Sequence, residues 1–191
     1  MFKEIFTRLY GLVVSPKATW TKMLNEGEKA HSLFFSHFLF PIMGMAALSC
    51  FVGLIGTEYQ PGTLEKVLKD AIVVFTKFFV SFYIIVYAWK ELARKFAISY
   101  DKELTERFVG MLLGLYIVVE IIINLLPVQF AFMKCAILGI PYIVWIGTTA
   151  FLQIEAPKYK MATIVFSVMI LFVPFIMGWL FDLVMPLSIT K

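Results

Sequence analysis

The chain has 191 residues, of which 61% are hydrophobic and only 16% are charged, and its formal net charge is +4. Soluble domains are usually about half apolar and about a quarter charged, so a water-soluble globule could not cover this much apolar surface with so few polar groups. The mean hydropathy of +0.87 therefore indicates a protein whose main solvent is lipid.

Residues 1–30 are expected to form a cytoplasmic segment rather than a signal peptide or a span. Charges occur throughout the opening, and the first long apolar run begins only near Leu33. This segment is predicted to hold an amphipathic helix in the membrane interface, its apolar face towards lipid; a docking site for a cytoplasmic partner is the alternative interpretation. The apolar side chains at helical spacing are Phe2, Ile5, Phe6, Leu9, Leu12 and Val13.

A second short helix is expected after this segment. Ser15 suits the N-cap position and Pro16 suits the first helical position. Trp20 would then lie at headgroup depth, where indole rings are favoured.

Five long apolar runs follow, each near the roughly 20 residues that a helix needs to cross about 30 Å of hydrocarbon. Because a helix satisfies its own backbone hydrogen bonds, five helices are the default. The sequence therefore predicts an all-α polytopic membrane protein with a five-helix transmembrane domain over residues 31–191. The expected spans cover residues 32–56, 71–91, 107–127, 130–152 and 161–182.

The lysines and arginines predict the orientation. Twelve of the 17 fall on the N-terminal segment, the connection between the second and third spans, and the connection between the fourth and fifth. The positive-inside rule therefore places the N-terminus in the cytoplasm and the C-terminus outside, in the cytoplasmic (inner) membrane. These charges suit anionic lipid and follow from topology, so they do not indicate nucleic-acid binding.

Charged residues within the spans are the main candidates for a site. Lys77 lies about six residues into the second span and Glu120 about seven residues from the outer end of the third, so both lie roughly 9–11 Å below the outer surface. An ion pair between these neighbouring antiparallel helices would lower the cost of each charge. Asn124 is one turn beyond Glu120 and could join them. Asp182 lies near the outer end of the fifth span, within reach of water or headgroups.

Two interpretations of this intramembrane polar site remain open. The pair could be structural and set the helix register. Alternatively, it could be a functional group in an ion or proton relay, or bind a lipid headgroup.

Small residues and prolines predict how the helices pack. Gly110 and Gly114 form a small-xxx-small pattern in the third span, for which internal packing is favoured over a dimer face. Pro127 is expected to end that span. Pro141 and Pro174 lie within the fourth and fifth spans and are expected to kink them.

Residues suited to catalysis or metal binding are few. His31 and His37 do not share a helical face well and are expected to be interfacial. Cys50 and Cys135 lie in apolar runs without a CxxC pattern and are expected to be buried as small hydrophobic residues. No HExxH, GxSxG, P-loop or Rossmann glycine pattern occurs, so we expect no enzyme, no metal and no cofactor.

The segment Arg8–Leu24 resembles the opening of prokaryotic members of the Yip family, membrane proteins named for interaction with Ypt/Rab GTPases. Their openings run as a short apolar helix, then Ser-Pro and a Trp. The segments Glu91–Phe96 and Leu125–Pro127 follow in the family's usual order, although Arg8 stands where eukaryotic members have an acidic residue. The matching residues are Tyr10, Gly11, Ser15, Pro16 and Trp20.

The resemblance implies five spans with a cytoplasmic N-terminus and a role in membrane organisation or trafficking. The expected function is a non-enzymatic scaffold or adaptor whose partners are membrane lipids and, as open alternatives, a second copy or a cytoplasmic protein. The competing hypothesis is a small transporter, channel or lipid-handling protein that uses a site at Lys77 and Glu120.

Overall fold

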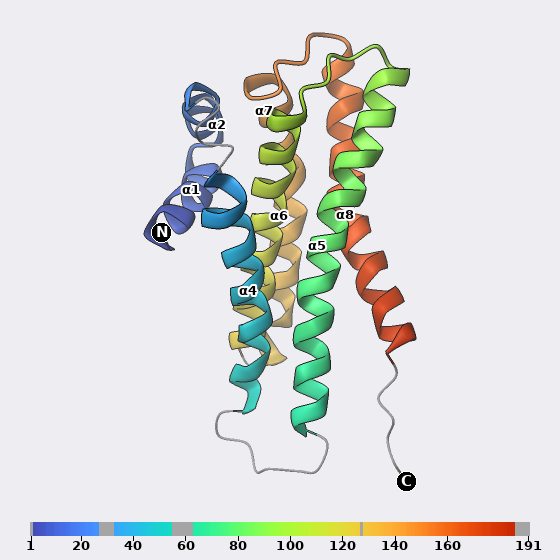
Figure 1. Ribbon diagram of the computed structural model, residues 1–191. Helices are drawn as coiled ribbons and strands as arrows, with labels where there is room; N and C mark the ends of the chain where they lie inside the picture. Colours follow the sequence, from blue (N-terminus) through green and yellow to red (C-terminus); the bar gives the residue numbers. More distant parts are fainter. Residues whose placement is uncertain (1, 27–32, 55–62, 127, 186–191) are drawn as a thin grey trace.

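The computed structural model describes residues 2–26, 33–54, 63–126 and 128–185 (Figure 1). These residues form helices joined by turns, with no strand among them, so the predicted all-α polytopic architecture is confirmed. Five stretches within them are long and apolar enough to cross a membrane. They are Phe35–Val52, Thr63–Lys95, Lys102–Leu125, Phe132–Ala150 and Lys158–Val184.

The first span is not a single α-helix. It begins as the π-helix η1 (Phe35–Leu39), continues as α4 (Phe40–Ser49) and ends in the 3-10 helix η2 (Cys50–Leu54). Pro41, in the first turn of α4, has no backbone N–H to donate, which explains a break from α geometry at this point. The outer parts of the predicted range 32–56 lie outside the described residues.

The second span is longer than predicted. The expected range was 71–91, with only a brief amphipathic turn before it, but α5 is one continuous helix over Thr63–Lys95. Its 33 residues correspond to about 50 Å at about 1.5 Å per residue, so α5 extends past the hydrocarbon.

The third span, α6 (Lys102–Leu125), begins about one turn before the predicted start at residue 107. Its start is capped by Asp101, whose carboxylate accepts a hydrogen bond of 3.0 Å from the backbone N–H of Leu104. It ends shortly before Pro127, which lies outside the described residues.

The fourth and fifth spans each contain a proline. The fourth starts with the 3-10 helix η3 (Val128–Gly139) and continues as α7 (Ile140–Ala150), where Pro141 occupies the first turn instead of kinking a continuous helix. Pro141 explains where α geometry begins, because proline suits the first turn of an α-helix. In α8 (Lys158–Val184) Pro174 is internal, and the lower half of this helix slants away from the bundle in Figure 1.

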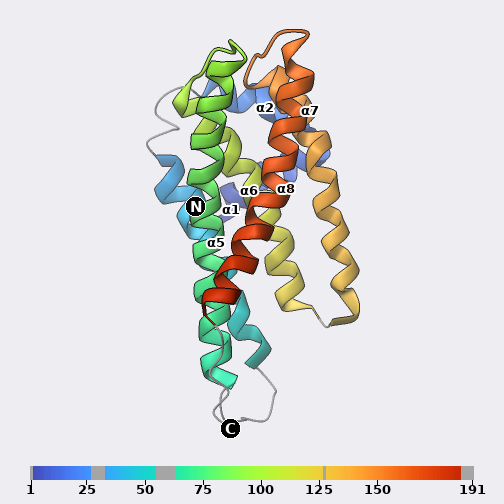
Figure 2. The same cartoon turned by 90° about the vertical axis from the view of Figure 1, so that its right-hand side faces the viewer.

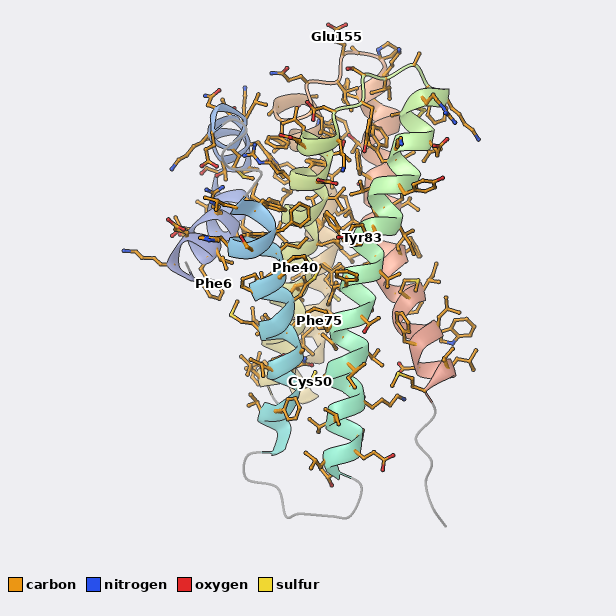
Figure 3. The ribbon with its side chains drawn as sticks, in the orientation of Figure 1. Phe6, Phe40, Cys50, Phe75, Tyr83 and Glu155 are labelled. Carbon is orange, nitrogen blue, oxygen red and sulfur yellow. The ribbon has the colours of Figure 1, made fainter. Side chains whose placement is uncertain are left out.

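Helix α5, like α6, packs against at least three of the other spans. It packs against α4, α6 and α8, and α7 packs against α8 (Figure 2). The basic connections from α5 to α6 and from α7 to α8 lie at the upper end of the bundle in Figure 1. Figure 3 labels Phe40, Phe75 and Tyr83 along the line where α4 faces α5, and Glu155 at the upper end.

The N-terminal helices belong to the bundle core. α1 (Phe2–Val14) and α2 (Pro16–Asn25) form a hairpin against the upper half of the bundle (Figure 1). The prediction that the apolar stripe of α1 faces lipid is wrong for Ile5, Leu9 and Leu12, which are buried in the protein core. Other apolar side chains of the same helix remain exposed, namely Phe6, Tyr10 and Val13.

Trp20 is buried within the protein, whereas its depth relative to the headgroup layer stays a prediction. It is 0% exposed and its indole N–H donates to the carbonyl of Ile143 at 3.3 Å. Burial against the rings of Phe108 and Phe151, together with this hydrogen bond, satisfies both the apolar body and the polar edge of indole. We call the five rings the aromatic cluster: Trp20, Trp89, Phe108, Phe151 and Phe166.

Gly110 and Gly114 pack inside the bundle, as the sequence predicted. A Cβ at Gly110 would come within 2.6 Å of the Phe34 ring, and a Cβ at Gly114 within 2.9 Å of the Phe38 ring. Phe34 and Phe38 stack on each other with centroids 5.1 Å apart. The two glycines therefore make room for a pair of rings at the start of the first span.

Candidate functional site

The predicted ion pair within the membrane is present. Lys77 Nζ on α5 lies 2.8 Å from Glu120 Oε1 on α6, and the two side chains are only 13% and 19% exposed. A lone charge at this depth would be costly, and the direct charge-assisted hydrogen bond offsets that cost for both groups. The pair therefore links α5 to α6 at this level.

A polar pocket of about 300 Å³ opens beside this pair. It lies between η2, α5, α6 and α8 at the end of the bundle opposite to α2. Carboxylates, an ammonium group, an amide and a thiol line it together with two valines and a glycine. The lining residues are Cys50, Asp70, Val73, Val74, Lys77, Glu120, Asn124, Gly178 and Asp182.

A second ion pair closes the rim of the pocket. Lys69 Nζ lies 3.3 Å from Asp182 Oδ1, which links α5 to α8. Lys69 is 15% exposed and Asp182 is 60% exposed, so this pair stands nearer to the bundle surface than the pair at Lys77. Asp70 is half-buried next to it and has no ion-pair partner within 4 Å among the described residues.

Asn124 lines the pocket but does not bond to the ion pair. Its amide Nδ2 donates to Ser49 Oγ at 2.9 Å and contacts Cys50 Sγ at 3.6 Å. Among the described residues, Asn124 therefore makes no direct hydrogen bond to Glu120, contrary to the prediction. Asn124 instead links α6 to the first span, because Ser49 is the last residue of α4. The Ser49 hydroxyl in turn donates to the carbonyl of Ala46 in the same helix.

The polar side of α5 continues past the ion pair. Ser81, one turn beyond Lys77, is fully buried, and its hydroxyl has no hydrogen-bond partner among the described residues. Deeper still, Phe78, Phe82 and Ile85 fill the interior between the pocket and the aromatic cluster. The pocket is thus open at one end of the bundle and backed by apolar packing.

The N-terminal motif residues build the hairpin of α1 and α2. A Cβ at Gly11 would come within 2.7 Å of Thr19 Oγ1, so glycine lets the two helices approach. Ser15 stands at the N-cap of α2 without a side-chain capping bond, and Pro16 follows in the first turn. Tyr10 is 70% exposed, in contrast to the buried Trp20.

Sequence reasoning missed the polar contact that holds this hairpin to the spans. Arg107 at the start of α6 is only 3% exposed; its guanidinium donates to the carbonyl of Met23 at 2.5 Å and lies 3.6 Å from Glu26. Arg8 of α1 binds the same Glu26 carboxylate at 2.7 Å. In the sequence, Arg107 contributes only to the predicted orientation of the chain. Its position directly before the apolar run was the available signal that its side chain could be buried.

Lys69 and Asp70 were also missed as site residues. They precede Lys77 on α5 by about two helical turns, and a spacing of seven residues returns to the same face of a helix. That spacing was the available signal. The spacing did not indicate a site, because the second span was predicted to begin only at residue 71, after Lys69 and Asp70.

The candidate metal-binding residues do not assemble. Among the described residues, no group of three or more His, Cys, Asp or Glu side chains is placed to hold a metal ion. Cys135 is exposed, so its predicted burial is wrong, whereas Cys50 is half-buried at the pocket. His37 is exposed on η1, and His31 lies outside the described residues.

The fold and the site together define an all-α polytopic membrane protein with a polar pocket at one end of a tightly packed bundle. Comparisons with protein-family models, with curated proteins and with solved structures found no match to this chain.

Proposed function

We propose that this chain is a non-enzymatic protein of the cytoplasmic membrane that acts as a membrane-organising scaffold or adaptor of the Yip type. Its N-terminus lies in the cytoplasm and its C-terminus outside. The observation that carries the proposal is the N-terminal hairpin, which is locked onto the bundle by Trp20 and Arg107. The sequence resemblance to the Yip opening falls on this same hairpin.

The interior of the bundle supports a fixed shape more than a conduction path. The rings of Trp20, Phe108 and Phe151 lie 5.0–6.2 Å apart, centroid to centroid, and Trp89 packs against Phe166 in a tilted arrangement at 4.2 Å. Such closely packed rings leave little room for a continuous polar path along which an ion could move. A scaffold, by contrast, needs a rigid surface of this kind.

The outer surface of α2 is the proposed contact with a cytoplasmic protein. Together with α7 it lines an open groove of about 930 Å³. The groove combines two lysines with hydroxyl, amide and apolar groups, which suits a partner segment with acidic and apolar residues. Its lining residues are Ser15, Pro16, Lys17, Ala18, Thr21, Lys22, Asn25, Tyr142 and Ile146.

Site-specific photo-crosslinking tests the scaffold role. A photo-reactive residue at Thr21, in the groove, is expected to capture a defined cytoplasmic protein from intact cells. The same residue at Lys95, exposed at the same end of the bundle but on α5, is the matched control and should not capture that protein. Proton or ion flux in liposomes that is abolished by Glu120→Gln would contradict a pure scaffold.

Lipid handling at the polar pocket is the second candidate function. The pocket beside Lys77 and Glu120 favours it over a channel, because charged groups at one end are backed by apolar side chains such as Phe78. A headgroup entering from the membrane surface needs no path through the bundle.

A further inference from the structure

The charges around the pocket do not balance pairwise. Three carboxylates (Asp70, Glu120 and Asp182) face two ammonium groups (Lys69 and Lys77). Glu120 and Asp182 are each engaged by a lysine, which leaves Asp70 as the carboxylate with no ion-pair partner within 4 Å among the described residues. Lys66 and Lys69 both influence Asp70 electrostatically, but Lys66 is exposed and Lys69 is engaged by Asp182, and neither lines the pocket. The pocket therefore offers a hydrogen-bond acceptor of negative charge.

The depth of the pocket matches a lipid headgroup. Asp70 precedes Lys77 by seven residues, so the rim and the ion pair are separated by about 10 Å along α5. The rim lies where α5 begins and α8 ends, which is where a span meets the headgroup layer. Trp179, 62% exposed near the end of α8, suits that same layer.

The side chains that line the pocket suit a primary ammonium group better than a quaternary one. Quaternary ammonium groups are usually held in cages of aromatic rings, and none of the described lining residues is aromatic. A primary ammonium group has three N–H donors, which match carboxylate acceptors such as Asp70 and Asp182. The chemistry therefore favours a primary amine over a choline group.

Gly178 forms the wall of the pocket on α8. A Cβ built there would meet only Lys77 Cδ, at 3.5 Å, an ordinary contact distance. A small side chain would therefore be tolerated, whereas a large one would project into the pocket.

We infer that this pocket binds the headgroup of a phospholipid that carries a primary ammonium group, with Asp70 as the main acceptor. The inference deepens the second proposed function, lipid handling, and does not depend on the scaffold role. The bound lipid is held at the outer end of the bundle by α5, α6 and α8.

Native mass spectrometry of the full chain in detergent tests the inference. The protein is mixed with equal amounts of phosphatidylethanolamine and phosphatidylcholine that carry the same acyl chains. Bound phosphatidylethanolamine is expected to exceed bound phosphatidylcholine by roughly tenfold, the size that one charge-assisted hydrogen bond supplies. Equal retention of the two lipids would overturn the inference.

Two variants locate the binding. Asp70→Asn keeps the shape of the side chain and is expected to reduce the preference to about twofold or less. Gly178→Leu fills the pocket and is expected to abolish the preference, whereas Gly44→Leu, with nothing within 4 Å of its Cβ position, should leave it unchanged. Retention of the preference in folded Gly178→Leu protein, or in Asp70→Asn protein, would contradict the assignment.

Free O-phosphoethanolamine separates a lipid from a small soluble amine. The same headgroup without acyl chains is expected not to displace the lipid at equal concentration, because the chains add contact with the flank of α8. Displacement at equal concentration would overturn the assignment to lipid. None of these measurements involves the α2 groove, so the outcome is independent of the crosslinking result, and liposome flux tests transport separately.

Discussion

Glu120 stands among aliphatic residues of α6, and its position is explained by Lys77, 2.8 Å away on α5. Two side chains that would each be unfavourable in hydrocarbon become a directional contact between two helices. Nearby, Lys69 and Asp182 repeat this arrangement at 3.3 Å between α5 and α8. Two ion pairs thus connect α5 to α6 and to α8 at the end of the bundle that holds the polar pocket.

Exchanging the charges tests the pair directly. Lys77→Glu and Glu120→Lys alone are each expected to destabilise the protein by about 3 kcal/mol, because each leaves two like charges together in a poorly solvated place. The double variant is expected to recover at least about 1 kcal/mol of the summed loss. Thermal unfolding in detergent, followed by circular dichroism, provides the measurement.

Lys95→Glu serves as the matched control for that exchange, since Lys95 is an exposed lysine on the same helix. It is expected to change stability by no more than about 0.5 kcal/mol. If the double variant is no more stable than either single variant, Lys77 and Glu120 do not act as a pair.

At the scale of elements, the contact of α6 with the first span depends on small residues. Gly110 and Gly114 admit the stacked rings of Phe34 and Phe38, and Asn124 bonds to Ser49 further along the same helix. Steric fit at one end and a hydrogen bond at the other therefore hold the two helices.

Adding a methyl group at Gly110 tests that fit. Gly110→Ala is expected to destabilise the protein by about 1–3 kcal/mol, because its Cβ would lie 2.6 Å from the Phe34 ring. Gly44→Ala, in α4 of the first span and with open space around its Cβ, should be neutral or slightly stabilising since alanine favours helix. Equal unfolding temperatures for the two variants would contradict the packing role.

The N-terminal hairpin shows a similar dependence at the level of two helices. Gly11 lets α1 approach α2, and Trp20 inserts between α6 and α7. The buried guanidinium of Arg107 then reaches both the last turn of α2 and Glu26. The hairpin is therefore part of the folded core and not a separate anchor.

At the scale of the whole molecule, the bundle has two chemically different ends. The end with α2 holds the aromatic cluster and the basic connections, whereas the other end holds the polar pocket. Where the five apolar stretches cross a membrane, these two ends face opposite sides of it.

Labelling with a membrane-impermeant maleimide tests the proposed orientation. In a background without Cys50 and Cys135, Glu65→Cys is expected to react in intact cells, because it is exposed near the pocket end. Lys95→Cys, exposed at the other end, is expected to react only after the membrane is made permeable. The reverse pattern would contradict a cytoplasmic N-terminus.

Much of the architecture was predictable from the sequence. Long apolar runs predict spans because backbone groups in lipid must be paired within a helix, so the five stretches were found. The pairing of Lys77 with Glu120 was predictable too, because depth in a membrane can be counted along a helix. Helix ends were less predictable: α5 continues beyond its apolar stretch and Asp101 caps α6 earlier than expected.

Tertiary structure alone decided which polar and aromatic groups meet. Trp20, Phe108 and Phe151 come from three helices, and no spacing along the chain predicts that they share one cluster. Asn124 donates a hydrogen bond to Ser49 and not to Glu120, because the end of the first span packs against α6 beside Asn124. The sequence by itself therefore indicated a lipid environment and the five spans, because both follow from composition. It also indicated the depth of the charges, because depth follows from the rise per residue of a helix. The pocket and the locked hairpin depend on contacts between distant helices, and only the folded bundle establishes those.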